Sequence, residues 1–357
     1  MPTALHIHFW ADIRNTAGSV EKVILSLATH GRAYSHAVAC CPPQAISRDF
    51  YRHRNVDVYA FHENHLRNRI LNKMFRLDAF TYPSLIATIE ELRPDILHFH
   101  NRQELVDAVI ERLSYRPGVA VHYHRHFAQP IVPRSADILL TVSRATESHI
   151  LSKTGTATKC CVLYNPLSQE LLEIAGAAPL PEPHNTSPLF LFGGGGGHHK
   201  GGRELIEAFQ RLPLGTARLA LAGNFGTESG SLASGIEIMG ILPVSRFLGL
   251  MKDSDIVVMP SRDESFGLIA QEAMFLGRPL IATKIGGLGE FVDDECAIIV
   301  EPGNVESLYL GMLSALAMLK DDVRRSVMLV SARKKVERFA PENIVAQLEK
   351  FYDECLQ

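Results

Sequence analysis

The stretch that decides the fold is PSRDESFGLIAQEAMFLGRPLIATKIGGLGE, residues 260–290. The apolar run DIVVMP (255–260) leads into it, a helical pattern occupies 266–276, and a second apolar run, PLIATK, follows at 279–284. Strand, helix and strand in this order are typical of a βαβ unit, whose helix begins at the carboxyl edge of a parallel sheet. The free N–H groups of a helix start, with Gly267 allowing close approach, predict a phosphate site there.

The same alternation of short apolar runs and helical patterns extends outward through most of the chain. We expect strands at 5–10, 36–41, 56–61, 95–100, 119–124, 138–143, 159–164, 188–193, 218–223, 235–240, 255–260, 279–284 and 297–302, and closing helices at 305–319 and 341–356. Residues 175–187, AGAAPLPEPHNTS, are rich in proline and small residues, as linkers are. The sequence therefore predicts an α/β protein with two Rossmann-like domains, over 1–170 and 188–340, a linker over 171–187, and a last helix over 341–357.

Composition fits this organisation. A chain of 357 residues is long enough for about two domains, and 46% hydrophobic with 21% charged residues is ordinary for globular proteins. The net charge of -3 gives no bulk attraction to nucleic acid, and we expect no nucleic-acid partner. No apolar run approaches the ~18 residues that span a bilayer, and the N-terminus lacks the pattern of a signal peptide. We expect a soluble, cytoplasmic protein.

Histidines are concentrated in the first half, where 13 of the 16 precede residue 170. His98 and His100 alternate along one expected strand and His122 and His124 along another, so that each pair shares a face. Zinc could use such a set. The interpretation that we favour is that most are hydrogen-bonded residues near strand ends, with one or two in a functional site.

Two glutamates flank the helix start at 266. Glu272 shares a helical face with apolar residues, where a carboxylate is costly unless something hydrogen-bonds it, as a ribose diol would. It lies ~9 Å along the axis from the helix start, about the span of a pyrophosphate. In that reading Glu264 reaches a sugar and the diphosphate lies between the two acids. In the other, Glu264 is a helix N-terminal charge and Glu272 belongs to a structural ion pair.

The run GGGGG at 193–197 fits G-x-G-x-x-G by composition alone, which is a weak signal for a dinucleotide. A dinucleotide site should have an acidic residue at the end of the next strand, but RLALAGN ends in Asn224, which counts against an NAD oxidoreductase. No G-K-[ST] follows, so the run is not a P-loop. We expect a loop that lets phosphates approach closely, with a flexible hinge as the alternative.

Taken together, these motifs resemble a known family. The string E-SFGLIAQ-E (264–272) resembles the donor-site motif of retaining glycosyltransferases of family 4, which have the GT-B fold. LFGGGGGHHKGGRELIEAFQRL (191–212) is similar to that family's strand–loop–helix ending in Lys-Gly, and DILHFHN, VAVHYH, LLTVS and LYNP resemble its N-terminal motifs. The resemblance implies two Rossmann-like domains facing each other across a cleft, with the C-terminal helix packing back on the first.

The resemblance also implies roles for individual residues. The catalytic residues would be Glu264, which contacts the donor hexose, Lys200, which neutralises the leaving diphosphate, and His124, which lies beside the transferred sugar, with His126 in its place if the register differs by two. Glu272 would hold the ribose hydroxyls. The remaining donor-binding residues would be Gly18, Ser19, Gly194, Gly195, Ser265, Phe266, Gly267 and Leu268. Gly195 stands where the family usually has an arginine, so either His198, His199 or another basic residue substitutes for it, or stabilisation of the leaving group is weaker than usual. Ser19 replaces a glycine, a milder change because its amide remains.

The resemblance thus implies an enzyme that moves a hexose from GDP-mannose or a UDP-hexose to a hydroxyl of a glycan, a lipopolysaccharide or a lipid-linked acceptor. The resemblance implies retention by a front-face route, without metal or cofactor. The alternatives are a nucleotide-sugar epimerase or hydrolase of the same fold, and a non-catalytic partner subunit. The basic amphipathic stretch HLRNRILNKMFR (65–76) predicts peripheral contact with an anionic membrane at its inner face, or an ordinary surface helix.

Overall fold

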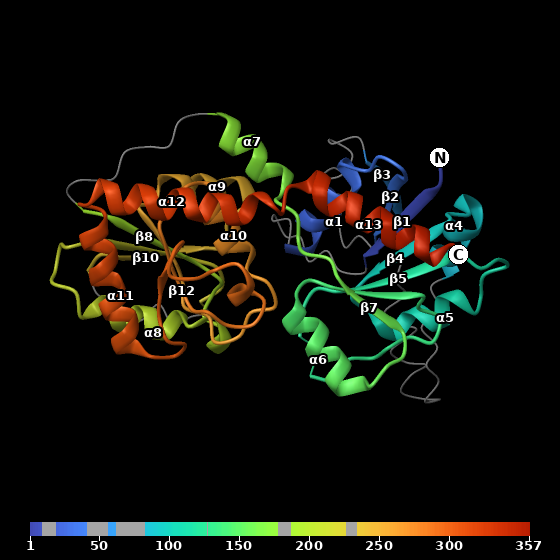
Figure 1. The fold of residues 1–357 in the computed structure, drawn as a ribbon, viewed down its shortest axis with the longest axis horizontal. Helices are drawn as coiled ribbons and strands as arrows, with labels where there is room; N and C mark the ends of the chain where they lie inside the picture. The colour runs from blue at the N-terminus through green and yellow to red at the C-terminus, as the bar shows by residue number, and fades with distance from the viewer. Residues whose placement is uncertain (9–18, 41–55, 62–82, 127, 178–186, 226–233) are drawn as a thin grey trace. The chain divides into compact units, whose positions relative to one another are not determined.

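The computed structural model describes residues 1–8, 19–40, 56–61, 83–126, 128–177, 187–225 and 234–357 of the chain. They form two compact units (Figure 1). The first comprises Met1–Pro166 and Pro341–Gln357, and the second comprises Leu167–Ala340. The basic stretch 65–76 lies outside the described residues. In the described part of the chain, no helix is both long enough and apolar enough to cross a membrane.

The expected linker at 171–187 needs correction. The two units divide between Pro166 and Leu167, and α7 (Gln169–Ala177) is a helix of the second unit. Its apolar residues are the reason, because Leu171 is fully buried, whereas the prolines of the segment begin only at Pro179. Residues 178–186 lie outside the described residues.

The first unit is built on a parallel seven-stranded sheet in the order β3-β2-β1-β4-β5-β6-β7. Its strands are β1 (Thr3–His8), β2 (Ser35–Cys40), β3 (Asp57–Ala60), β4 (Ile96–His100), β5 (Gly118–Tyr123), β6 (Ile138–Thr141) and β7 (Lys159–Val162). Its helices are α1 (Ser19–Thr29), α4 (Pro83–Leu92), the short η1 (Gln103–Leu105), α5 (Val106–Ile110), α6 (Arg144–Thr154) and α13 (Pro341–Cys355).

The two faces of this sheet are chemically different. Alternate residues of β1, β4 and β5, such as Leu5, Phe99 and Val121, join α4 and α5 in an apolar core. The residues between them face the other way, and several are histidines. Helix α13 packs on β5 and α1. Its Glu349 Oε1 accepts hydrogen bonds from the backbone N–H groups of residues 32–34 at 2.7–3.2 Å.

The second unit has a parallel six-stranded sheet in the order β10-β9-β8-β11-β12-β13. Its strands are β8 (Leu189–Gly193), β9 (Arg218–Ala222), β10 (Ile236–Gly240), β11 (Ile256–Met259), β12 (Leu280–Ala282) and β13 (Ile298–Ile299). Its helices, besides α7, are η2 (His198–Lys200), α8 (Gly202–Gln210), α9 (Val244–Asp253), α10 (Leu268–Phe275), η3 (Leu288–Glu290), α11 (Val305–Met318) and α12 (Asp322–Glu337). Helices α8 and α11 pack on one face of the sheet, and α12 packs against α10 (Figure 1).

Helix α12 is not among the helices expected from the sequence. Three of its residues are buried, Met328, Ala332 and Val336, each four positions after the last, and most of the others are charged or exposed. An apolar stripe one residue wide is a weak sequence signal for a helix. Packing against α10 supplies the additional stabilisation.

In both sheets the strand order reverses beside the first strand, between β1 and β4 and between β8 and β11. The carboxyl ends of the strands at such a switch point are where open α/β sheets bind ligands. The loops that follow β8 and β11 are those that carry the glycine run and the two glutamates.

Candidate functional site

The candidate donor site is formed in the second unit by the loops after three neighbouring strands. Strand β8 pairs with β11, and β11 pairs with β12. Their carboxyl ends lead into residues 194–201, 260–267 and 283–287. The fold therefore brings together segments that lie up to about ninety positions apart in the sequence.

The glycines after β8 are required where backbones approach closely. Gly195 has φ 73°, and a Cβ on it would lie 2.7 Å from the carbonyl oxygen of Asn224. Gly201 also has φ 73°, and its Cβ would lie 2.2 Å from the carbonyl oxygen of Pro260. Such contacts explain the departure at Gly195, because an arginine there would strain the backbone and collide with the loop after β9.

Lys200 and Glu264 form an ion pair across this site. Lys200 Nζ lies 2.6 Å from Glu264 Oε2, and the two side chains are 26% and 12% exposed. The backbone of Glu264 is also fixed, because its carbonyl oxygen accepts a hydrogen bond from the Gly287 N–H at 3.0 Å. Gly286 passes so close that a Cβ on it would lie 2.2 Å from the same oxygen. Neither sequence interpretation of Glu264 anticipated a lysine partner 64 positions away.

Helix α10 begins at Leu268, two residues later than the sequence pattern predicted. Gly267 stands at its N-cap with φ 110°, a left-handed conformation that interrupts the helix before this point. The Phe266 side chain is buried against the rings of Phe291 and Phe339, with ring centroids 5.2 and 5.3 Å apart. The ring therefore anchors the loop, while Leu268 opens the first turn, whose N–H groups have no partner within the helix.

Glu272 is 1% exposed and lies in a helix that is buried almost all around, from Ala270 to Phe275. The sequence placed this carboxylate in an apolar stripe, and its burial agrees with that placement. Ser265, half-buried, precedes Phe266 in the loop, and Gly194, exposed, follows β8. The structure thus gathers the predicted residues of the second half at one edge of one sheet.

His124 lies in the first unit, directly after β5. Its Nε2 is 2.8 Å from His100 Nδ1, and its backbone N–H donates to Asn101 Oδ1 at 3.0 Å. Burial lowers the pKa of His124 well below its ordinary value, and the nearby His122 and His8 lower it further. His124 is therefore a neutral imidazole near pH 7.

Asn101 is a residue that the sequence analysis missed. Asn101 and Arg102 have φ 56° and 54°, left-handed conformations that are uncommon outside glycine and concentrate at functional sites. An asparagine directly after the strand DILHFH was the available signal, because asparagine tolerates this conformation. Ser19 is the first residue of α1, and Gly18 lies outside the described residues.

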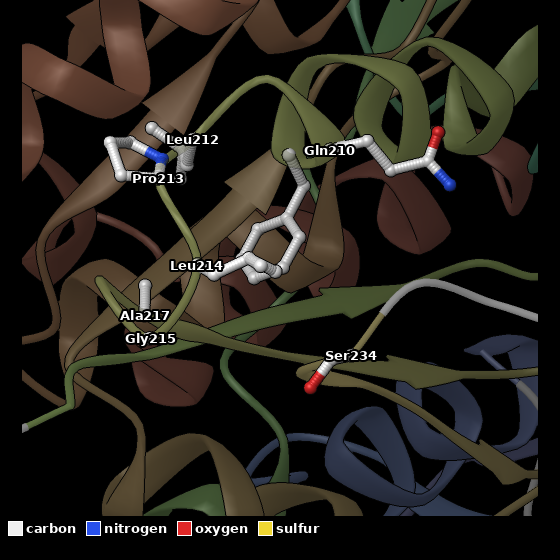
Figure 2. Close-up of a pocket in the computed structure, with 8 residues that line it drawn as sticks. Gln210, Leu212, Pro213, Leu214, Gly215, Ala217 and Ser234 are labelled. Carbon is white, nitrogen blue, oxygen red and sulfur yellow. The ribbon is translucent and has the colours of Figure 1, made fainter.

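A small pocket in the second unit does not contribute to this site (Figure 2). Its lining includes Leu214, Gly215 and Ala217 before β9 and Ser234 before β10. These residues are at the amino ends of the strands, opposite to the glycine loop. Its volume of ≈ 30 Å³ has room for about one water molecule and not for a sugar.

Two family models match the chain. Residues 20–171 match the model described as Glycosyltransferase Family 4, and residues 187–318 match Glycosyl transferases group 1. The chain belongs to the family 4 glycosyltransferases. The resemblance stated from the sequence is thereby confirmed, and the protein is a transferase enzyme.

Curated relatives of this glycosyltransferase agree with the assignment. D-inositol 3-phosphate glycosyltransferase of Xylanimonas cellulosilytica is 32% identical over 177 residues, 46% of this chain and 42% of that protein. An uncharacterized glycosyltransferase of Methanocaldococcus jannaschii is 25% identical over 324 residues, 83% of this chain and 88% of its own length. The first alignment spans less than half of the relative.

Solved structures confirm the fold of the glycosyltransferase. A glycosyltransferase from Rickettsia africae has a TM-score of 0.77 at 18% identity and covers 100% of this chain and 99% of its own. Anabaena HepE in complex with UDP-glucose has a TM-score of 0.75 at 18% identity, covering 98% and 99%. The expected GT-B class is therefore confirmed.

Proposed function

We propose that this glycosyltransferase moves a hexose from a nucleotide diphosphate sugar to a hydroxyl of a glycan or lipid-linked acceptor, with retention and without a metal in the transfer step. The observation that carries the proposal is the Lys200–Glu264 pair, 2.6 Å apart beside the start of α10. The lysine cation and the N-terminus of α10 suit the diphosphate of such a donor, and the glutamate anion suits the hydroxyls of its sugar.

The diphosphate belongs at the N-terminus of α10. The amides at Phe266, Gly267 and Leu268 and the positive end of the helix dipole favour negative charge there. Lys200 then exchanges its carboxylate partner for phosphate oxygens. The exchange releases the carboxylate of Glu264, which accepts hydrogen bonds from the hexose hydroxyls. Glu272, inside the same helix, accepts hydrogen bonds from the ribose diol.

The transfer follows a front-face route. The bond from the anomeric carbon to the phosphate oxygen breaks, and the acceptor oxygen forms its bond to that carbon on the same face. The acceptor proton passes to the leaving phosphate oxygen. Lys200 and the helix N-terminus stabilise the negative charge that grows on the leaving group. Of all the effects of the chain, this one lowers the activation barrier most. Glu264 orients the sugar and forms no bond to it.

His124 supplies a neutral imidazole at the position to which the family resemblance assigns a contact with the transferred sugar. A neutral ring can accept a hydrogen bond from a hydroxyl or donate one to it, and it adds no positive charge that would compete with the developing sugar cation. The hydrogen bond to His100 and the backbone bond to Asn101 hold the ring and its backbone in place.

The test begins with the donor. Thermal unfolding is measured with UDP-glucose, UDP-N-acetylglucosamine and GDP-mannose, and the donor that raises the Tm is then titrated by calorimetry. UDP-glucose comes first because HepE, of the same fold, binds it. Turnover is assayed with and without acceptor. Consumption of donor without acceptor would favour the epimerase or hydrolase, and binding without turnover would favour the non-catalytic subunit.

A further inference from the structure

The histidine face of the first unit holds a cluster that the proposed transfer does not use. His6 of β1 and His98 and His100 of β4 are 0%, 0% and 1% exposed. Each offers one ring nitrogen, and the three nitrogens all lie within 4.8 Å of one another. The pairing of β1 with β4 sets this geometry, because His6 stands opposite His98 in the register.

The other nitrogen of each ring already has a partner. His6 Nε2 lies 2.8 Å from His36 Nδ1, and His98 Nδ1 lies 2.7 Å from the Tyr352 hydroxyl of α13. His100 Nδ1 lies 2.8 Å from His124 Nε2. An imidazole whose far nitrogen is held in this way is typical of a metal ligand, because the partner fixes both tautomer and ring orientation.

The remaining nitrogen of each ring, His6 Nδ1, His98 Nε2 and His100 Nε2, is the one available to bind an ion. His6 Nδ1 and His100 Nε2 are 2.9 Å apart, and His98 Nε2 has no hydrogen-bond partner among the residues that the structure describes. A buried polar atom without a partner costs free energy that a ligand would recover.

We propose that His6, His98 and His100 form a binding site for a late first-row transition-metal ion such as Zn²⁺. Three imidazoles with no carboxylate or thiolate favour zinc, copper or nickel over magnesium or calcium. With Zn–N bonds of ~2.0–2.1 Å, the nitrogens would stand roughly 3.3 Å apart, so the His6–His100 contact opens slightly while the most distant pair closes. A water molecule would take the fourth position.

One tautomer assignment satisfies both nitrogens of all three ligand rings. With the ion on His6 Nδ1, His98 Nε2 and His100 Nε2, the opposite nitrogens all carry protons. They donate to His36 Nδ1, to the Tyr352 hydroxyl oxygen and to His124 Nε2 respectively.

A buried carboxylate offsets part of the ion's charge. His36 Nε2, left with its proton, lies 3.7 Å from Glu349 Oε1. A chain therefore runs from the ion through two imidazoles to a carboxylate that three backbone N–H groups fix. At 3.7 Å this carboxylate is beyond hydrogen-bond distance of His36 Nε2, so it acts on the ion through its charge alone.

A second set of three, His100, His122 and His124, is the weaker candidate. Neither ring nitrogen of His122 has a hydrogen-bond partner within the described part of the chain, so no hydrogen bond fixes its tautomer for an ion. His100 and His124 would also have to give up their mutual hydrogen bond. The ion at the first set stays one imidazole away from His124 and takes no part in the bond-making steps.

The test uses the full chain without a histidine tag, stripped with a chelator and then titrated with Zn²⁺ by calorimetry. We expect one equivalent to bind and to raise the Tm. We expect His98→Gln to weaken Zn²⁺ binding at least 100-fold, and Tyr352→Phe, which releases only the far nitrogen of His98, to weaken it about 10–100-fold. His149→Gln, in α6 and outside the cluster, is the matched control and should bind as the wild type does.

Circular dichroism of the metal-free variants separates loss of binding from loss of folding. If His98→Gln fails to fold, Tyr352→Phe decides alone. Failure of the stripped wild type to take up Zn²⁺, Co²⁺ or Ni²⁺ would overturn the proposal, as would equal Zn²⁺ affinity in Tyr352→Phe and His149→Gln. In that event the cluster is a hydrogen-bonded histidine network only.

Discussion

Replacing Lys200 with methionine is the sharpest test of the donor site. The change keeps an unbranched side chain of similar length and removes the charged ammonium group. The lysine nitrogen is 2.6 Å from Glu264 Oε2, a distance at which two unit charges attract by about 1.6 kcal/mol in bulk water and about 6 kcal/mol at an effective dielectric constant of about 20. Desolvation and side-chain entropy cancel most of this, so that partly exposed pairs retain roughly 0.2–1 kcal/mol.

The effect on turnover should be far larger than the effect on stability. A loss of up to about 1 kcal/mol lowers the Tm by roughly 2–4 °C in a domain of this size. Losing one preorganised group that stabilises developing charge costs about 10²–10³ in kcat, or roughly 2.7–4 kcal/mol. Lys200→Met should therefore remain folded at assay temperature and lose at least 99% of its turnover.

The matched control is Lys159→Met. Lys159 Nζ lies 2.6 Å from Glu354 Oε2 in an exposed pair on the first unit, so this variant loses an ion pair of the same length away from the donor site. The assay is initial-rate kinetics with the donor found by thermal shift, alongside a melting curve for each variant. If Lys200→Met turned over within about threefold of Lys159→Met, the lysine would not contact the leaving group and the assignment would be wrong.

Three other variants test the remaining parts of the site. Glu272→Gln should weaken donor affinity about 10–100-fold by calorimetry, since hydrogen bonds to charged groups are worth ~1.5–3 kcal/mol; unchanged affinity would place the ribose elsewhere. Gly195→Arg restores the usual residue of the family but should lower the Tm and not raise turnover, because its Cβ would lie 2.7 Å from Asn224 O at a φ of 73°; a more active, equally stable variant would contradict this. Asn101→Ala removes the acceptor for the His124 N–H, and we expect lower kcat with donor affinity retained, which kinetics and calorimetry together check.

The spacing of apolar residues along the chain was sufficient to predict much of the fold. The alternation of apolar runs with helical patterns was sufficient for two parallel α/β sheets, because burial on both faces makes such strands apolar throughout. It also placed Glu264 and Glu272 around a helix start, and Glu272 in a buried stripe. These features depend on residues within one or two turns of one another, which is the range that periodicity reads.

The spacing of residues along the chain does not predict which distant loops contact each other. Lys200 and Glu264 are each recognisable, but their 2.6 Å contact depends on β8 and β11 being neighbours in the sheet. The position of Gly195 against Asn224 likewise depends on how the loops after β8 and β9 pack. Helix α12 could not be predicted from the sequence because its apolar stripe is narrow, and it is stabilised by packing on the surface of α10.

The sequence by itself determined the two sheets, the family and the acidic and basic residues of the candidate donor site, because periodicity and motif order depend only on residues that are near one another along the chain. Only the tertiary structure decided that a carboxylate and a lysine meet, that an arginine has no room at 195, and that His6, His98 and His100 converge. Strand register and order set those contacts, and both result from the packing of the whole unit.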